Sequence, residues 1–396
     1  MKNFENLDNQ IHEKMNEKLG IPNLDEILAE KPLRDLNPIF IKAFRERAAN
    51  RNPNEILQDY ESKNEFYGVS SIDQRKLIKL ESTFYEILPE KFHAVEVSPI
   101  SPLGLNSVIT KVSQDISLST IRGSEVISDP TTSLVLECAM RRKKQLVNEN
   151  TRMELVNLAT AQRVLRLQPF DKDKGYMQHF TLFGLCTGGR DKGEASFVVD
   201  STIEHISIWL DLIKHLKNSG YAFDNISVNI SDIRVLEKLI TTLSLPREEI
   251  NKNSFNEDFD FFKEYNIRIP KEIFSMQEIK TELFEQYGLG DKIAYLSALE
   301  QRVIQPLREK YPDIRFCLDF ARKGGLGYYQ NVCFHIFASN FNGRNIPLAD
   351  GGSVDWLGKL LSSNKERAFT SGFGAELVQK LFSQIKKNRY DLRKPT

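Results

Sequence analysis

The chain has 396 residues, of which 40% are hydrophobic and 27% are charged. This balance is typical of soluble globular proteins and not of disordered or membrane proteins. The 54 basic residues equal the 54 acidic residues, so the net charge gives no reason to expect a polyanionic partner. The N-terminus lacks the apolar segment of a secretory signal, and no run of eighteen apolar residues occurs. We therefore expect a cytoplasmic protein with no membrane segment.

The four cysteines give no indication of a metal centre or of disulfide bonds. They lie far apart in the sequence, no two form a CxxC pair, and no histidine stands beside them at the spacing of a metal ligand. We expect these cysteines to be reduced and mostly buried, and we expect no metal site.

Taken in chain order, residues 1–71 are polar and helix-prone, with Pro32, Pro38 and Pro53 as breaks, and are interpreted as an N-terminal helical extension. After Ser71, apolar residues recur at helical spacing as far as Ile87, which predicts an amphipathic helix. A short strand is expected in HAVEVSPISPL, and another in ISLSTIRG at 116–123. Asp129 or Thr131 can then cap a helix that continues to RRKK.

The next elements indicate a sheet. Two strands, within 153–170 and 176–187, are expected to pair antiparallel across the polar loop DKDKG. Further elements follow in the order helix 198–216, strand 224–230, helix 234–240, helix 293–307, strands 314–320 and 327–338, a strand near 346, and a helix within 373–387. Residues 245–290 lack a clean period and are interpreted as a peripheral or inserted segment. Strands with helices on one side favour an α+β fold with a mixed or antiparallel sheet.

Five segments, in this order, resemble class II aminoacyl-tRNA synthetases of the histidyl type. Residues 72–102 are similar to motif 1, RVLRLQPFDKDKGYMQHFTLFG at 163–184 to motif 2, GGLGYYQNVCFHIF at 324–337 and DGGSVDWL at 350–357 to the histidyl signature, and TSGFGAELVQKLF at 370–382 to motif 3. The resemblance implies a synthetase-like core over residues 72–390, with an antiparallel sheet flanked by helices. It also implies a homodimer, because motif 1 builds the dimer interface in that family.

The resemblance also shows where charged groups have been lost. The ATP-binding arginine of motif 2 falls on Arg163, but the adenine-contacting glutamate falls on Leu165. The arginine of motif 3 falls on Leu377 or Gln379, and neither side chain can give a charged bidentate contact to phosphate.

The histidyl signature departs from the family in the same way. Its catalytic arginine falls on Gly324, with Arg322 and Lys323 nearby, and the aspartate before the two tyrosines falls on Gly327. On a strand, the two tyrosines would point to opposite faces. The family segment that holds the ammonium group of the amino acid falls on residues 128–132. The candidate ligand-binding residues are therefore Asp129, Thr132, Arg163, Arg322, Lys323, Tyr328, Tyr329 and Asp355.

Loss of one contact to developing charge typically costs about 3 to 4 kcal/mol of transition-state stabilisation, so loss of several should abolish histidine activation. About 14 residues follow the motif 3 segment, so no C-terminal anticodon-binding domain is expected. We interpret the chain as a non-aminoacylating paralogue that binds a small ligand or a protein partner. It is similar in this respect to the regulatory subunit of ATP phosphoribosyltransferase. No catalytic residue and no cofactor is assigned.

Two alternatives remain open. An ATP-dependent ligase for another amino acid or carboxylate would use Arg163, Lys172 or Lys174, and Arg322 or Lys323, as phosphate contacts, with ATP and Mg²⁺ as cofactors. An RNA-binding protein would use residues 1–71 and the basic run RRKK at 141–144. Basic runs at helix ends usually complement the helix dipole, so nucleic-acid binding is not our expectation.

Overall fold

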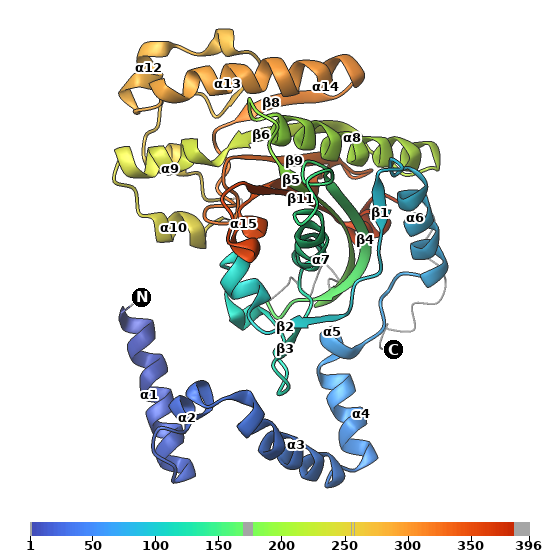
Figure 1. The fold of residues 1–396 in the computed structure, drawn as a ribbon, viewed down its shortest axis with the longest axis vertical. Coiled ribbons are helices and arrows are strands. Elements are labelled where there is room, and N and C mark those ends of the chain that lie inside the picture. The colour runs from blue at the N-terminus through green and yellow to red at the C-terminus, as the bar shows by residue number, and fades with distance from the viewer. Residues whose placement is uncertain (1, 169–176, 255, 257, 384–396) are drawn as a thin grey trace.

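A computed structural model describes residues 2–168, 177–254, 256 and 258–383, and a mixed nine-stranded sheet lies at its centre (Figure 1). The strands stand in the order β1-β4-β5-β11-β10-β9-β6-β8-β7. Their bounds are β1 Phe92–Ala94, β4 Val156–Leu165, β5 His179–Arg190, β6 Asp224–Asp232, β7 Glu272–Ile273, β8 Arg315–Asp319, β9 Val332–Ser339, β10 Asn345–Val354 and β11 Glu366–Phe373. The β1–β4 and β6–β8 pairs are parallel and the others antiparallel. The predicted α+β fold with a mixed sheet is confirmed.

One face of the sheet is covered by α7 (Pro130–Gln145) and α15 (Trp356–Leu361). Asp129 caps α7, as predicted, because its carboxylate accepts a hydrogen bond from the Thr131 backbone N–H at 2.9 Å. Gly188 on β5 allows the helix to approach closely, since a Cβ atom there would lie 2.2 Å from Cys138 Sγ. All four cysteines are buried, in agreement with the prediction.

The opposite face is packed by α6 (Gln74–Glu86), α8 (Ser196–Asn218) and α16 (Ala375–Leu381). Phe84 of α6 stacks on Phe183 of β5, with 4.4 Å between ring centroids, and on Trp209 of α8 at 5.6 Å. Beside this stack lies the buried His205, whose ring nitrogens are 2.8 Å from Ser371 Oγ and 3.0 Å from Thr187 Oγ1. Burial lowers the pKa of His205 to about 3.

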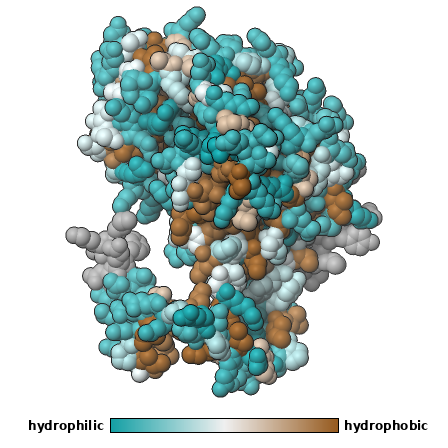
Figure 2. All heavy atoms as spheres, in the orientation of Figure 1, coloured by the Kyte–Doolittle hydropathy of each residue, from teal (hydrophilic) through white to brown (hydrophobic). Residues whose placement is uncertain are grey.

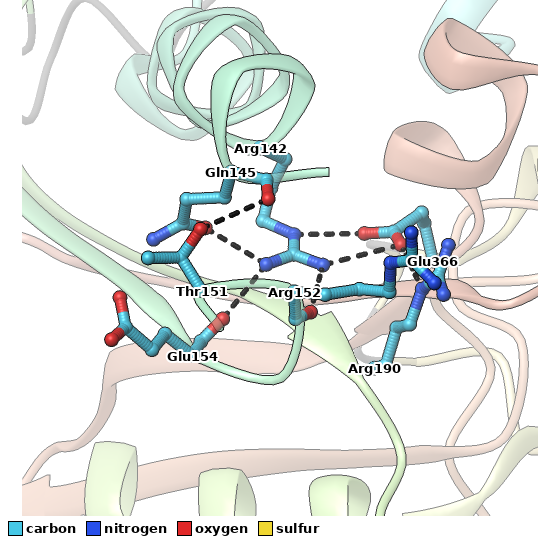
Figure 3. A network of polar contacts seen from close by, with 7 residues as sticks. All are labelled: Arg142, Gln145, Thr151, Arg152, Glu154, Arg190 and Glu366. Carbon is cyan, nitrogen blue, oxygen red and sulfur yellow. Dashed lines mark hydrogen bonds and ion pairs between the residues drawn. The ribbon is translucent and has the colours of Figure 1, made fainter. Parts of the chain in front are cut away.

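A buried ion-pair network fixes the C-terminal end of α7 (Figure 3). Arg142 donates from Nε to Glu366 at 2.9 Å, and Arg190 donates to the same carboxylate at 2.6 Å. Both Arg142 and Glu366 are fully buried. Burial alone would raise the pKa of Glu366, but hydrogen bonds from the two arginines outweigh it and hold that pKa below its ordinary value. The network therefore holds the C-terminal end of α7 against the start of β11. Because the helix is rigid, this contact also fixes the position of its N-terminal end at Pro130.

The remaining helices of the core lie toward the β8 and β7 edge (Figure 1). They are α9 Ile233–Thr242, α10 Arg247–Lys252, α11 Phe261–Glu264, α12 Thr281–Gln286, α13 Ile293–Leu299 and α14 Gln305–Lys310, with short turns η4 Met276–Glu278, η5 Gly290–Lys292 and η6 Glu300–Ile304 between some of them. The helix expected over 293–307 is therefore interrupted by a π-helical turn. Residues 245–290 contain short helices and the edge strand β7.

Residues 2–67 form a separate series of helices, called the arm below, which extends away from the sheet (Figure 1). It consists of α1 Lys2–Leu19, α2 Leu24–Glu30, α3 Leu33–Ala49, α4 Pro53–Ser62 and α5 Asn64–Tyr67. Among the arm side chains that the structure describes, Leu36 is the buried hydrophobic one. The arm is held at its end by a backbone hydrogen bond from the Gln178 N–H to the Glu65 carbonyl at 3.0 Å, and just beyond it the His179 side chain lies with Nε2 2.7 Å from the Gly68 carbonyl.

Three local expectations are corrected. The strand expected at 116–123 is β3 at Ser124–Val126, which pairs with β2 (Ile100–Pro102) in a small lobe. The two tyrosines of the histidyl signature lie in a turn before β9 and not on the strand. β11 was not expected as a strand. Its sequence, ERAFTSGF, mixes short and polar residues with two phenylalanines, although the strand lies in the middle of the sheet beneath both layers of helices.

Candidate functional site

A row of residues crosses the α7 side of the sheet, one from each of the neighbouring strands β5, β11, β10, β9 and β6. Directly paired residues on neighbouring strands project from the same face. The register pairs Gly184 with Gly372, Gly372 with Asp350, Asp350 with His335, and His335 with Asn229. This face is the α7 side, since a Cβ atom on Gly184 would lie 3.1 Å from Pro130 of α7.

The middle of this row, where the partly exposed Asp350 lies beside Gly372, is called the central recess below. Asp350 lies on β10, the fifth of nine strands, yet its side chain is 45% exposed. Its neighbour Gly372 has open space above it, because a Cβ atom there would meet within 4 Å only the Phe183 carbonyl, at 3.7 Å. The absence of a side chain at Gly372 leaves space beside the partly exposed carboxylate of Asp350.

Asp350 is held between a guanidinium group and an imidazole. Arg322 Nη2 donates to Asp350 Oδ1 at 2.8 Å, and His335 Nε2 lies 3.4 Å from Oδ2. Burial raises the pKa of Asp350, but Arg322 and His335 outweigh it and hold that pKa well below its ordinary range. The Arg322 side chain is only 4% exposed, and its Nη1 has no hydrogen-bond partner among the described residues. The pair therefore stays ionised and still offers one donor.

The two tyrosines form the wall next to this pair. Tyr329 fits a slot between two glycines, since Cβ atoms on Gly325 (φ +100°) or Gly352 would each lie 2.6 Å from its ring. Tyr328 packs edge-on against Tyr329 and against Trp356, with 4.9 Å between ring centroids in both cases. Burial, with the Asp129 carboxylate as a further cause, raises the pKa of Tyr328 well above its ordinary value. Both phenols are therefore neutral hydrogen-bonding groups at physiological pH.

The first turn of α7 supplies the third side of the site. The Asp129 carboxylate, which caps the helix, also lies 3.6 Å from Arg166 Nη2. Arg166 Nε donates to the Ser128 carbonyl at 2.8 Å. Thr132 Oγ1 donates to the Asp129 carbonyl at 2.8 Å, so its hydroxyl stabilises the helix start. The structure thus brings Asp129 and Thr132 to the same end of α7 as the tyrosines.

Three of the predicted site residues lie elsewhere. Arg163 projects from the opposite face, where its Nη1 lies 2.8 Å from Glu376 Oε1 on α16. Successive residues of a strand point to opposite faces, and Arg163 of β4 therefore points away from the face that carries Asp350. The Lys323 ammonium donates to the Asn256 and Phe259 carbonyls, so it points to the peripheral segment. Asp355 begins α15 and pairs with Lys359 at 2.8 Å.

The sequence did not single out Asp350, Asn229 or Arg166. Asp350 is the first letter of the DGGSVDWL segment, and the one available signal was an aspartate preceding two glycines on an expected strand. His335 lies on β9, and the structure shows it paired with Asp350. Lys172 and Lys174 lie outside the described residues.

The structure indicates neither a metal centre nor a membrane segment within the residues it describes. Over 2–168, 177–254, 256 and 258–383, no three His, Cys, Asp or Glu side chains are grouped to hold an ion. Over the same residues, no helix combines the length and apolar character needed to cross a bilayer.

Comparison with known proteins places the fold. No protein-family model matches the chain, and no curated protein matches it by sequence. Solved structures do match. An ATP phosphoribosyltransferase regulatory subunit/histidyl-tRNA synthetase from Bacillus halodurans is 16% identical, with a TM-score of 0.56 over 79% of this chain and 81% of that one.

Two further structures agree. A histidyl-tRNA synthetase from Nostoc is 16% identical, with a TM-score of 0.57 over 80% of this chain and 74% of that one. A histidine–tRNA ligase subunit from Alicyclobacillus acidocaldarius is 15% identical, with a TM-score of 0.56 over 78% of this chain and 92% of that one. At this identity the likeness concerns the fold alone. The chain therefore has the class II fold shared by histidyl-tRNA synthetases and the ATP phosphoribosyltransferase regulatory subunit, as the order of its motifs predicted.

Proposed function

We propose that this chain is a non-aminoacylating synthetase-like protein that binds a small polar ligand in the central recess and acts as a ligand-binding or regulatory subunit. The observation that carries the proposal is charge pairing. Arg322 faces Asp350 and Arg166 faces Asp129, while Arg163 lies on the other side of the sheet. A triphosphate needs cationic groups that the protein has not already neutralised.

The recess nevertheless keeps hydrogen-bonding capacity for a smaller molecule. Asp350 is partly exposed, and Arg322 Nη1 and Asn229 Oδ1 are buried atoms without a partner among the described residues. Buried polar atoms are normally paired, with protein, water or ligand. A ligand that offers both a donor and an acceptor would satisfy the carboxylate and the guanidinium together.

The ligase alternative receives less support from the same contacts. Arg163 is directed to Glu376, and Lys323 donates to backbone carbonyls. A side chain at Gly324, where the family has its catalytic arginine, would meet no atom within 4 Å. Packing therefore does not forbid an arginine at this position, and its absence agrees with a protein that does not form adenylates.

A regulatory role also implies a protein partner. The Bacillus halodurans structure is described in part as a regulatory subunit of ATP phosphoribosyltransferase. We propose a comparable arrangement for this chain, in which occupation of the recess alters binding to a catalytic partner.

Thermal unfolding of the full chain with candidate ligands tests this function. A ligand at a hundred times its dissociation constant adds about 2.7 kcal/mol to the stability. We expect no shift with millimolar ATP and Mg²⁺, and a clear shift with at least one molecule from a panel of free amino acids and related zwitterions.

The shift should be lost in Asp350→Asn and kept in Asp355→Asn, a control of similar exposure (35%) whose carboxylate pairs with Lys359 outside the recess. A shift with ATP and Mg²⁺ together with exchange of pyrophosphate into ATP would contradict the proposal and favour the ligase.

A further inference from the structure

The arm exposes far more apolar surface than a self-contained domain would. Its helices carry apolar side chains at helical spacing, such as Ile11, Met15 and Leu19 on α1, but only Leu36 is buried among the described arm residues. Figure 2 shows hydrophobic patches on this part of the molecule. The exposed large hydrophobic side chains of the arm are Ile11, Met15, Leu19, Ile21, Ile27, Leu28, Leu33, Ile39, Phe44, Ile56, Leu57, Tyr60 and Tyr67. Exposed apolar surface on this scale usually marks an interface.

A second apolar set lies next to the arm, on the lobe formed by β2, β3 and the π-helical turn η1 (Leu105–Thr110). Its exposed members are Ile100, Leu103, Val108 and Leu118. The arm touches this lobe at one point, since a Cβ atom on Gly123 would lie 2.7 Å from Leu33 Cδ1. Beyond this contact α3 and α4 diverge from residues 50–52 (Figure 1).

The helices of the arm differ in the sign of their charge, and this difference indicates which kind of partner the arm binds. α4 carries Glu55, Asp59 and Glu61 and no basic residue, and α2 is likewise only acidic. α3 instead carries four basic side chains, Arg34, Lys42, Arg45 and Arg47, against two acidic ones. A partner with one sign of charge, such as RNA or an anionic membrane, would be repelled by α2 and α4. A second copy of the arm offers both signs of charge, since its α3 is basic and its α4 is acidic.

We propose that the arm is a self-association element: the arm of one copy lies against the arm and the β2–β3 lobe of a second copy, with α3 facing the acidic α4 of its partner. Such an isologous contact uses the same surface on both copies, which explains why apolar stripes and opposite charges lie on one segment. This interface differs from the dimer expected through the motif 1-like region, because α6 belongs to the core and not to the arm.

Sedimentation equilibrium of the full chain tests the proposal with a matched pair of variants. Ile56 on α4 and Ile78 on α6 are each 55% exposed, so a glutamate at either position is compatible with folding. We expect concentration-dependent self-association through the arm, with a dissociation constant that rises about tenfold or more in Ile56→Glu. Ile78→Glu lies in the motif 1-like region 72–102 and therefore tests the other expected interface, and it should leave association through the arm unchanged. Circular dichroism should give the same helical content for both.

Charge reversal provides the second measurement. Arg45→Glu with Arg47→Glu on α3, and Glu61→Lys on α4, should each weaken the dimer, and combining them should recover part of the affinity. The proposal is overturned if the wild type stays monomeric up to about 100 µM. It is equally overturned if Ile78→Glu dissociates the dimer while Ile56→Glu does not, or if a monomeric chain binds a structured RNA through the arm.

Discussion

The two faces of the central sheet are built from alternate residues of the same strands, yet they have different chemistry. On the α6, α8 and α16 side, aromatic rings stack around Phe84 and a neutral buried histidine. On the α7 side, glycines, ion pairs and an exposed carboxylate surround the central recess. The alternation of a strand allows one face to provide stability while the other keeps polar groups accessible. Substitutions on the two faces should therefore differ in what they change.

The largest effect is expected from the aromatic face. Phe84→Ala should lower the free energy of unfolding by about 4 kcal/mol, because it leaves a cavity between Phe183 and Trp209. Urea denaturation measures this change. Ile78→Ala, at an exposed position of the same helix, should stay within about 0.5 kcal/mol of the wild type. Equal effects of the two substitutions would show that α6 is not packed as described.

The next effect concerns the buried ions that hold α7. Glu366→Gln should cost about 3 kcal/mol, because Arg142 loses its fully buried counter-charge. The same denaturation experiment on Glu366→Leu, Arg142→Leu and the double variant provides a cycle. The double variant should be more stable than the sum of the single changes predicts. An additive result would mean that the two side chains do not interact.

The stability that the aromatic face provides should also depend on pH, through His205. His205 titrates near 3 when folded and near 6.5 when unfolded, so the unfolded chain binds more protons between these values. The contribution of His205 to the free energy of unfolding is complete above pH 6.5 and is lost as pH falls toward 3. About 2 kcal/mol of it is lost by pH 5. His205→Gln should show a smaller loss of stability between pH 7 and 5 than the wild type. His215→Gln, at an exposed position on α8, should behave as the wild type does.

The smallest effect on stability is expected in the recess. Asp350→Asn should cost about 1 to 2 kcal/mol, less than Glu366→Gln: the buried Arg322 loses its counter-charge, but the carboxylate is 45% exposed and the amide oxygen can still accept the hydrogen bond from Arg322. Asp350→Asn should instead abolish the stabilisation that the ligand gives. Isothermal titration with a ligand identified by thermal shift measures this difference. Retained affinity in Asp350→Asn would place the ligand elsewhere.

The sequence predicted most of the periodic elements and the order of the motifs. The helix after Ser71, the Asp129 cap and the paired strands β4 and β5 follow from spacing and turn chemistry. β11 was missed because a strand buried on both faces has no alternation of polar and apolar residues.

The site was only partly predictable, for a different reason. The tyrosines, Arg322 and the start of α7 were singled out because they are close in sequence to recognisable motifs, and the structure places them near one another. Asp350, His335 and Asn229 meet through strand register, which sequence spacing does not reveal. Arg163 was misplaced by the same limitation, since one step along a strand moves a side chain to the other face.

The order of strands has a consequence for how the protein folds during synthesis. The centre of the sheet is occupied by β10 and β11, which are among the last segments to be made, whereas β4 and β5 on one side and β6 and β9 on the other come earlier. A nascent chain that ends before residue 345 therefore has two partial sheets with unpaired edges, which are prone to pair with other chains. Premature termination between the end of β9 and the start of β10 should yield aggregates rather than a smaller folded protein.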